Sequence, residues 1–258
     1  MMPDANVDPV WGCLGHVTPG TPQNGLVNVT MPFIDLVSMM PLTGLGVRAC
    51  QKLDVKCDRP VNSMVAVADP MGISRFQVPS GFDGYGQIVE TTDAGDPIWA
   101  DAGPDAGDSG TMMPAAGRFI PSIVFFQPPI IRDLDYGIVP IFKPSDIDVL
   151  AGAQGNTWDK NYGLFFIGIL DCSRKPAAGA TFEINVIDQA TKRFYYVNGF
   201  PDELAPSTDA SGFGGLLNAR PGSITVTARV QATQVKIGEA TVLVKAGTAS
   251  YIYLPPTP

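Results

Sequence analysis

Short runs in which apolar and polar residues alternate, each ended by turn-forming residues, constrain this chain more than any other feature. The segments 27–33, 181–186 and 224–230 each place an apolar residue at every second position. A period of two is that of a β-strand with one buried face. The 28 glycines and 24 prolines supply turns between such strands. The pattern predicts an all-β protein, and 258 residues suffice for two β-sandwich modules with a short connecting helix.

The two halves of the chain repeat one order of turn motifs. Each half has an aromatic-Ile pair, a P-x-x-G turn, a D-x-x-G turn and a final Pro with Gly. We interpret Asp69 with Gly72, and Asp209 with Gly212, as turn-capping pairs, with a catalytic or calcium role for the aspartates as the alternative. The matched segments are Phe33-Ile34 with Phe166-Ile167, Pro41–Gly44 with Pro176–Gly179, Asp69–Gly72 with Asp209–Gly212, and Pro79–Gly81 with Pro221-Gly222.

This order of strands and turns resembles the carboxypeptidase regulatory-like, or transthyretin-like, domain. The likeness covers 27–90 and 162–256, and Ser207–Phe213 is close to the family pattern, whereas Asp69 departs from it because Pro70 follows. The resemblance implies Greek-key sandwiches of seven strands, no cofactor, and a role in surface structure, adhesion or carbohydrate contact. The two-module arrangement, with Trp11–Gly15 ahead of it, is similar to exported proteins and lipoproteins of myxobacteria-like bacteria.

The four cysteines indicate an oxidising compartment. No C-x-x-C pair is present and His16 is the sole histidine, so a zinc site is disfavoured against disulfides, with buried free thiols as the other alternative. We predict the bridges Cys50–Cys57, around the loop 51–56, and Cys13–Cys172. Disulfides imply export, although residues 1–8 lack the features of a signal peptide. We therefore expect a signal sequence or a lipid anchor upstream of residue 1.

The predicted domain boundaries follow changes in composition. A helix is predicted over 145–154, with Ser145 as N-cap and Asp148 three residues later. Residues 119–131 could add a strand to the first module. The predicted segments are an extended leader (1–25), the first module (26–92), an Asp/Gly-rich loop (93–117), a connector with the helix (118–161) and the second module (162–258).

Charge and hydropathy exclude several partners. The formal net charge is −8, which disfavours binding to nucleic acid or anionic lipid. No apolar run of 18 residues occurs, so no membrane span is predicted. The remaining partners are an unknown protein or a glycan.

The motifs do not predict an enzyme, a cofactor site or a metal site. A nucleophilic triad would need His16, which lies in the Gly/Pro-rich leader. Gly44–Ala49 fits G-x-G-x-x-A, but no helix is predicted to begin there, so a dinucleotide site is disfavoured. An irregular calcium site is the alternative to a solvated loop at Asp93, Asp96, Asp101, Asp105 and Asp108, although no EF-hand glutamate follows.

The aromatic residues leave the function open between two kinds of binding protein. Trp158 and Phe194-Tyr195-Tyr196 are candidates for stacking on sugars, with core packing as the alternative. We expect a non-catalytic surface structural or adhesion protein of the cell envelope. The alternatives are a carbohydrate-binding accessory module and, third, an enzyme with an unrecognised carboxylate pair.

Overall fold

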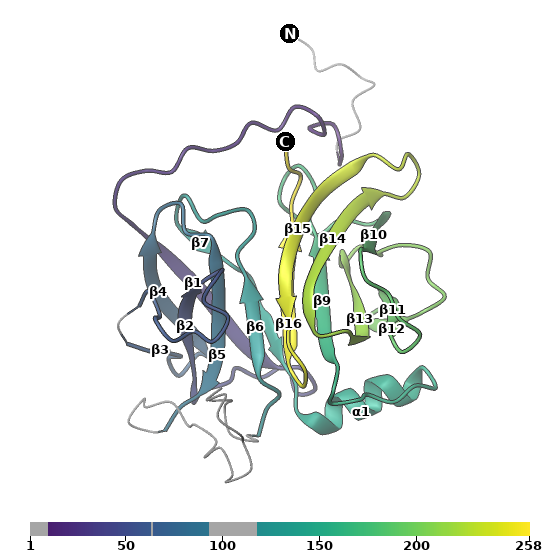
Figure 1. Ribbon diagram of the computed structural model, residues 1–258, viewed down its shortest axis with the longest axis horizontal. Helices are drawn as coiled ribbons and strands as arrows, with labels where there is room; N and C mark the ends of the chain where they lie inside the picture. The colour runs from purple at the N-terminus through teal and green to yellow at the C-terminus, as the bar shows by residue number, and fades with distance from the viewer. Residues whose placement is uncertain (1–9, 63, 93–117) are drawn as a thin grey trace. The chain divides into compact units, whose positions relative to one another are not determined.

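The computed structural model describes residues 10–62, 64–92 and 118–258, and the chain divides into two compact units (Figure 1). The first sandwich is formed by Thr21–Leu150, and the second by Ala151–Pro258 together with the segment that ends at Gly20. The fold class of two all-β sandwich modules with one short helix is confirmed.

The first sandwich contains eight labelled strands in two sheets. One sheet has the order β4-β1-β7, with β8 also paired to β1, and the other has the order β3-β2-β5-β6. Strand β1 runs antiparallel to β4 and parallel to β7 and β8. The bounds are β1 Leu26–Asp35, β2 Leu45–Gln51, β3 Ala66–Val67, β4 Ile73–Pro79, β5 Gly84–Glu90, β6 Ser122–Phe125, β7 Leu134–Asp135 and β8 Val139–Ile141.

The second sandwich also contains eight strands, in sheets of order β12-β11-β13-β9-β16 and β10-β14-β15. Strand β9 runs antiparallel to β13 and parallel to β16, the same relations that β1 has with β4 and β7. The bounds are β9 Gly163–Ile169, β10 Ala180–Ile184, β11 Lys192–Val197, β12 Phe200–Asp202, β13 Phe213–Ala219, β14 Gly222–Val230, β15 Lys236–Val244 and β16 Ala249–Leu254.

The two sandwiches share the register of their first strand pair. Ile73 lies opposite Pro32 in the first, and Phe213 lies opposite Gly168 in the second, each one residue after a glycine corner. Phe33 therefore corresponds to Ile169. The sequence motifs had aligned Phe33 with Phe166, three residues earlier, because the aromatic-Ile pair recurs there by chance while the hydrogen bonds follow the corner.

Alternation along the strands builds both cores. Strand β1 alternates between exposed or half-buried positions and buried Val27, Val29, Met31 and Phe33. Full burial of such a side chain is worth roughly 1.5–3 kcal/mol relative to exposure. The largest fully buried side chains are Met31, Phe33, Leu45, Phe126, Ile141 and Phe142 in the first sandwich, and Leu164, Phe165, Ile167, Ile169, Phe182 and Tyr195 in the second.

The helix α1, Pro144–Ala153, begins earlier than the sequence pattern predicts. Pro144 takes its first position, where a missing N–H costs nothing. A carboxylate oxygen of Asp146 accepts a hydrogen bond from the Lys143 N–H at 2.8 Å, so Lys143 rather than Ser145 is the N-cap residue.

Residues 118–143 are part of the first sandwich rather than a connector. Strand β6 pairs with β5, and β7 and β8 pair with β1, so this segment completes both sheets. The three short strands carry few alternating positions, which is why the sequence indicated only one of them. The predicted loop 93–117, with its five calcium candidates, lies outside the described residues.

Candidate binding surface at the disulfide-stapled loop

Two disulfides join the four cysteines. Cys50 at the end of β2 is bonded to Cys57 across a Cα–Cα distance of 5.2 Å, and both side chains are fully buried. Cys13 is bonded to Cys172 across 5.8 Å, within the second unit. The Val10 carbonyl also accepts a hydrogen bond from the Cys172 N–H, so the segment beside Cys13 is held by more than the bridge. The short bridge closes the connection after β2, which we call the stapled loop (residues 50–57).

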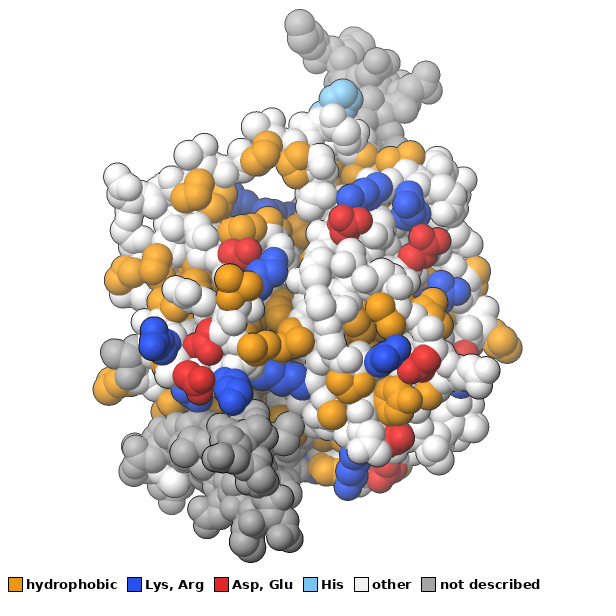
Figure 2. Space-filling view, viewed as in Figure 1, with side chains coloured by type: hydrophobic (Ala, Val, Ile, Leu, Met, Phe, Trp, Pro, Cys, Tyr) orange, Lys and Arg blue, Asp and Glu red, His pale blue; other side chains and the backbone are white. Residues whose placement is uncertain are grey.

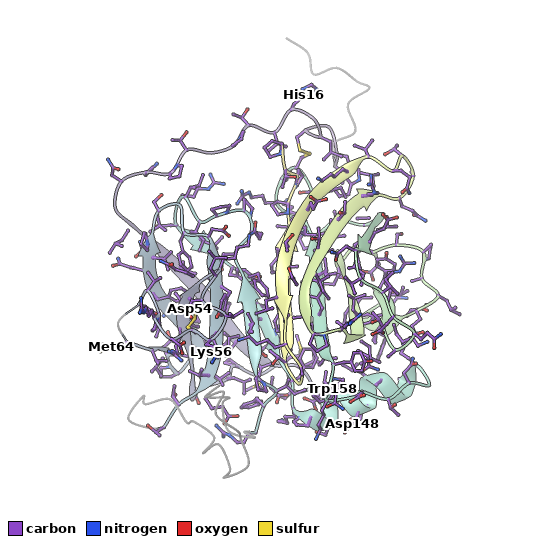
Figure 3. The ribbon with its side chains drawn as sticks, in the orientation of Figure 1. His16, Asp54, Lys56, Met64, Asp148 and Trp158 are labelled. Atoms are coloured by element: carbon purple, nitrogen blue, oxygen red, sulfur yellow. A yellow bond between two sulfur atoms is a disulfide. The ribbon has the colours of Figure 1, made fainter. Side chains whose placement is uncertain are left out.

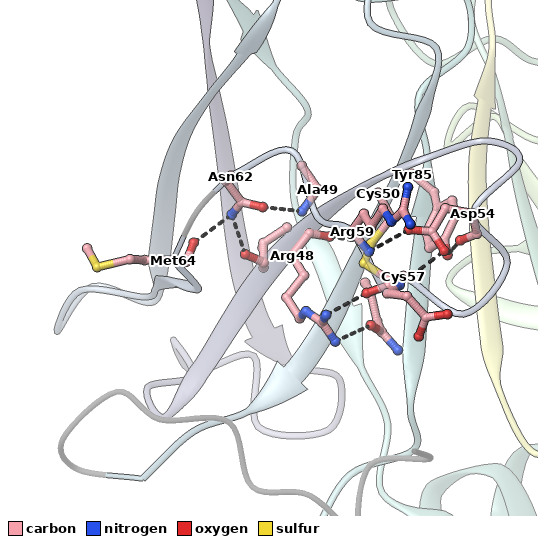
Figure 4. Close-up of a disulfide and its surroundings, with 12 residues drawn as sticks. Arg48, Ala49, Cys50, Asp54, Cys57, Arg59, Asn62, Met64 and Tyr85 are labelled. Carbon is pink, nitrogen blue, oxygen red and sulfur yellow. Dashed lines mark hydrogen bonds between the residues drawn. A yellow bond between two sulfur atoms is a disulfide. The ribbon is translucent and has the colours of Figure 1, made fainter. Parts of the chain in front are cut away.

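The stapled loop is organised around Asp54. Its carboxylate accepts hydrogen bonds from the N–H groups of Asp58 at 3.0 Å and Arg59 at 2.8 Å. Its carbonyl accepts one from Cys57 N–H and one from the Tyr85 hydroxyl (Figure 4). Burial opposes ionisation of Asp54, but these amide donors outweigh it and hold the pKa of the carboxyl below its usual range. The loop therefore carries an ionised carboxylate that acts as an internal cap.

Arg48 holds the loop in place through hydrogen bonds from its guanidinium group. Its guanidinium donates to the Cys57 carbonyl and, at 3.5 Å, to the side-chain oxygen of Gln87 on β5 (Figure 4). Burial lowers the pKa of this guanidinium from its usual value, although the charges of Tyr85 and Asp54 act in the opposite direction. The group remains a cation, so it fixes the loop by charge-assisted hydrogen bonds.

The chain that leaves the loop is tied to the edge of β2 by one amide. The Asn62 side-chain oxygen accepts from Ala49 N–H at 2.7 Å, and its nitrogen donates to the carbonyls of Val47 and Met64, each at 2.9 Å. The amide thus extends the pairing of β2 beyond β3, which lies opposite Gly46 and Val47 alone. Sequence reasoning missed Asn62 and Arg48, because neither lies in a motif.

The loop presents apolar groups to solvent instead of burying them. Leu53 is 92% exposed and Met64, just beyond the loop, is 80% exposed. In Figure 3, Asp54 and Lys56 lie near the disulfide and Met64 lies at the outer margin of the first unit. Lys52 pairs with Asp83 at 3.4 Å. A rigid loop that displays leucine beside cations can contact a partner with little loss of conformational entropy.

The two turn aspartates bond to their own turns. A carboxylate oxygen of Asp69 accepts from the N–H groups of Met71 at 2.9 Å and Ile73 at 3.0 Å. That of Asp209 accepts from Ser211 N–H at 2.9 Å, and its second oxygen accepts from Asn198 N–H at 3.0 Å. Both carboxylates use backbone donors, so neither is available as a free acid or base.

Glycine is required at the corners that follow these aspartates. Gly72 and Gly212 have φ of +72° and +69°. A Cβ atom would lie 2.8 Å from the Phe33 carbonyl oxygen at the first and 2.7 Å from that of Ile169 at the second. Both the positive φ and the close backbone approach exclude other residues.

The aromatic residues proposed for sugar stacking lie mainly in the core. Tyr195 is 1% exposed and its hydroxyl accepts a hydrogen bond from Phe182 N–H at 3.2 Å, while Phe194 is 8% exposed. A stacking platform needs an exposed ring face, which these two residues do not offer. Trp158 is half-buried, and among described side chains its indole N–H is one of three buried polar groups without a hydrogen-bond partner.

A hollow of about 460 Å³ lies beside β10 and β11 in the second sandwich. The guanidinium of Arg193 lies 5.7 Å from the Tyr195 ring centroid and donates to the Phe182 carbonyl at 3.4 Å. These contacts also occupy the open edge of β10. The hollow is lined by Phe182, Glu183, Ile184, Ile187, Thr191, Arg193 and Leu216.

The remaining chemical candidates do not form a site. Residues 46–49 of the G-x-G-x-x-A match lie in β2, where no helix N-terminus could hold a phosphate. His16 is exposed in the leader. Within the described ranges, no group of three or more His, Cys, Asp or Glu side chains is arranged to hold a metal ion, and no helix is long and apolar enough to cross a bilayer. On the face in Figure 2, acidic and basic side chains are interspersed.

Comparisons with known proteins give only remote structural neighbours. No protein-family model and no curated protein matches the sequence. The D295N mutant of the shaft pilin SpaA from Lactobacillus rhamnosus GG is 12% identical with a TM-score of 0.28, and the match covers 91% of this chain and 99% of that one. The minor pilin GBS52 of Streptococcus agalactiae is 14% identical with a TM-score of 0.26, covering 90% and 98%. The Bacillus anthracis TIE protein is 12% identical with a TM-score of 0.25, and this chain spans 34% of its length. At this level of similarity the neighbours assign neither a family nor an activity.

Proposed function

We propose that this protein is a non-catalytic structural or adhesion component of the cell envelope, exported to an oxidising compartment. The observation that carries the proposal is the stapled loop: a seven-residue separation closed by a disulfide, with Leu53 92% exposed at its tip. A covalent staple and a half-buried arginine, Arg48, hold a surface apolar side chain in one place. Such preorganisation serves contact with a partner, since the exposed Leu53 side chain itself contributes nothing to the core.

The partner class is a protein surface with an apolar pocket flanked by carboxylates. Lys52, Lys56 and Arg59 lie within or next to the loop, whereas the whole chain has a formal net charge of −8. Asp54 and Asp58 offset two of these three cations, so residues 50–59 have a net charge of +1, against −8 for the whole chain, and this difference favours a partner patch of opposite charge. The pocket would receive Leu53.

Export is tested on intact producing cells. Trypsin is applied to the cells, and released peptides are identified without reduction. The proposal expects peptides joined through Cys50–Cys57 and Cys13–Cys172 in the supernatant. Their appearance only after lysis, or as free thiols, contradicts it. Sequencing the mature N-terminus tests the further proposal of an upstream signal sequence or lipid anchor.

The contact role of the loop is tested with labelled protein on the surface of producing cells. Leu53→Asp is compared with wild type and with Val149→Asp, a control that makes the same change at a site 71% exposed on α1. We expect Leu53→Asp to weaken binding roughly tenfold and the control to have no effect. Equal binding by all three proteins would remove the loop from the proposal.

A carbohydrate-binding role is the second candidate, favoured by the hollow beside β10. Its volume of about 460 Å³ and its mixture of Arg193, Glu183 and apolar side chains suit a small polar ligand. A glycan array with wild type and Arg193→Met tests it: binding that Arg193→Met abolishes supports it, and an array without binding rejects it. Membership of the carboxypeptidase regulatory-like family stays a proposal, supported by the shared strand pairing of the two sandwiches.

A further inference from the structure

The two sandwiches differ in what lies beside one strand. In the second, β13 is paired on one side with β9 and on the other with β11. The corresponding strand of the first, β4, pairs with β1 and ends its sheet, and no described strand pairs with its other side. Figure 1 shows β4 at the margin of its unit. The position that β11 fills in the second sandwich is therefore open in the first.

The length of the connection after β2, and its hydrogen bonds to β2, explain the open position. The connection 185–205 in the second sandwich is long enough to form β11 and β12 before the Asp209 corner. The equivalent connection 52–65 is shorter, and Asn62 and Val61 N–H tie it back to β2. Ala68 N–H bonds to the Leu45 carbonyl as Thr208 N–H bonds to that of Ala180. The residues just before the Asp69 and Asp209 corners thus bond to their sandwiches in the same way. The difference lies in the connection before them, which in the second sandwich is long enough to place β11 beside β13.

The register identifies the unpaired groups on β4. Phe33 N–H bonds to the Gly72 carbonyl, so Ser74, Phe76 and Val78 direct their amide groups toward β1. Arg75 and Gln77 direct theirs outward. At one end, the outward groups of Ile73 are already bonded to Asp69, and at the other, Pro79 has no N–H. Two N–H and two C=O groups, those of Arg75 and Gln77, remain without a partner among the residues that the structure describes, and they lie symmetrically about Phe76.

We propose that β4 pairs antiparallel with β4 of a second copy of this chain. A two-fold axis at Phe76 places Arg75 of each copy opposite Gln77 of the other. Each such pair exchanges two hydrogen bonds, so the four donors and four acceptors of the two copies are all satisfied. This register also keeps Arg75 from facing Arg75, which would place like charges opposite each other. A strand from another polypeptide would not need this symmetry.

The contact stands apart from the binding role proposed for Leu53, because it uses the edge of the sheet β4-β1-β7, whereas the stapled loop follows β2 in the other sheet of the first sandwich. It also needs no other protein as partner. It joins two copies by main-chain hydrogen bonds and few side chains. The expected complex is therefore a weak, concentration-dependent dimer.

Sedimentation equilibrium of the full chain tests the proposal. The mass should rise from 27.3 kDa toward twice that value with concentration. The Arg75 guanidinium pairs with Asp69 of its own chain, and the Gln77 amide donates to Asn28, so both contacts are shared with the dimer partner. Gln77→Glu faces Arg75 of the second copy and should tighten the dimer roughly twofold, and Gln77→Arg should weaken it by a similar factor. Gln231→Glu and Gln231→Arg, in an exposed turn of the second sandwich, make the same charge changes and should leave the dissociation constant unchanged.

Hydrogen exchange of the wild type gives a second measurement that no variant can confound. The N–H groups of Arg75 and Gln77 should gain protection as the protein concentration rises. A monomer at every concentration up to the millimolar range would overturn the proposal, as would a dimer in which these amides exchange freely. Loss of affinity in both Gln77 variants alike would reject the register centred on Phe76.

Discussion

The corner that follows the first strand has the same hydrogen bonds in both sandwiches, but a different interaction links it to the rest of the chain. Asp35 accepts hydrogen bonds from Val37 N–H at 3.1 Å and Ser38 N–H at 2.8 Å. Asp171, in the equivalent place, accepts from Ser173 N–H at 2.7 Å and Lys175 N–H at 2.9 Å. In each case the next turn brings a proline into a bridge with the residue before the aspartate.

The two sandwiches differ in the interaction that links this common corner to the rest of the chain. The other oxygen of the Asp35 carboxylate, 6% exposed, pairs with Lys143 just after β8, so an ion pair links the first strand to the last. In the second sandwich Cys172, next to Asp171, is bonded to Cys13, and a covalent link secures the leader instead. The corner is thus a local structure, whereas the ion pair or disulfide that holds it depends on residues far away in the chain.

Of these interactions, the long disulfide should contribute most to the free energy of unfolding. Cys13→Ser with Cys172→Ser removes a bridge over 159 residues and should lower the free energy of unfolding by about 5 kcal/mol, because the unfolded chain gains loop entropy. Cys50→Ser with Cys57→Ser should cost about 2.5 kcal/mol. Denaturant unfolding of the full chain measures both. If the short bridge proved the costlier, the loop-entropy account would be wrong.

The ion pair should make the first corner sensitive to acid. Hydrogen bonds from Lys143 and then Ser38 N–H lower the pKa of Asp35 from 3.8 to about 2, against the effect of burial. A carboxyl group whose pKa is lowered in the folded protein contributes its full stabilisation at pH values above the ordinary pKa of 3.8. This stabilisation is lost as the pH falls through about 2. Lys143→Met should therefore destabilise the protein at pH 7 and lose its effect near pH 2.

The matched control for the ion pair is Lys175→Met in the second corner, where the backbone rather than the side chain contacts the aspartate. Thermal unfolding between pH 2 and pH 7 compares the two variants. A pH-dependent loss in Lys175→Met as large as that in Lys143→Met would contradict the assignment.

Turn capping should have a smaller effect. Asp209→Ala removes acceptors for Ser211 and Asn198 N–H and should cost about 1 kcal/mol without altering any binding activity. Asp69→Ala should act in the same direction, and Asp209→Asn should recover part of the loss, since an amide oxygen still accepts. Denaturant midpoints measure these changes. A neutral Asp209→Ala would leave turn capping unsupported.

The smallest effect is expected at the tip of the stapled loop. Leu53→Ser changes a side chain that is 92% exposed and should shift the free energy of unfolding by less than about 0.5 kcal/mol. Asn62→Ala, which removes the amide from β2, serves as the contrasting variant and should destabilise. A large loss in Leu53→Ser would mean that the loop supports the fold rather than displaying a contact.

The sequence predicted the long strands well and the short ones poorly. Strands β1 and β14 carry enough alternating positions for their period to be recognised, and the Asp-x-x-Gly corners needed only local chemistry. Strands β6 to β8 are two to four residues long, too short for a period, so residues 118–143 were assigned to a connector. Helix α1 was found, but its start was misplaced by the choice of Ser145 over Pro144.

The candidate surface could be foreseen only in part. The spacing of Cys50 and Cys57 suggested a local bridge, since both cysteines lie close together in the chain. Arg48, Asn62 and Tyr85 gave no signal, because their roles arise from hydrogen bonds to backbone groups up to 31 residues away. The stacking role considered for Tyr195 failed because burial depends on which sheet faces which.

The sequence by itself determined the class of this fold and its corners, because strand period, glycine at positive φ and aspartate caps act over a few residues. The tertiary structure alone decided that β4 ends its sheet while β13 is covered, and that Lys143 meets Asp35. The first outcome depends on the path of the connection after β2 or β10, and the second on the pairing of β8 with β1. Both are set by contacts between segments far apart in the chain, which no short window of sequence contains.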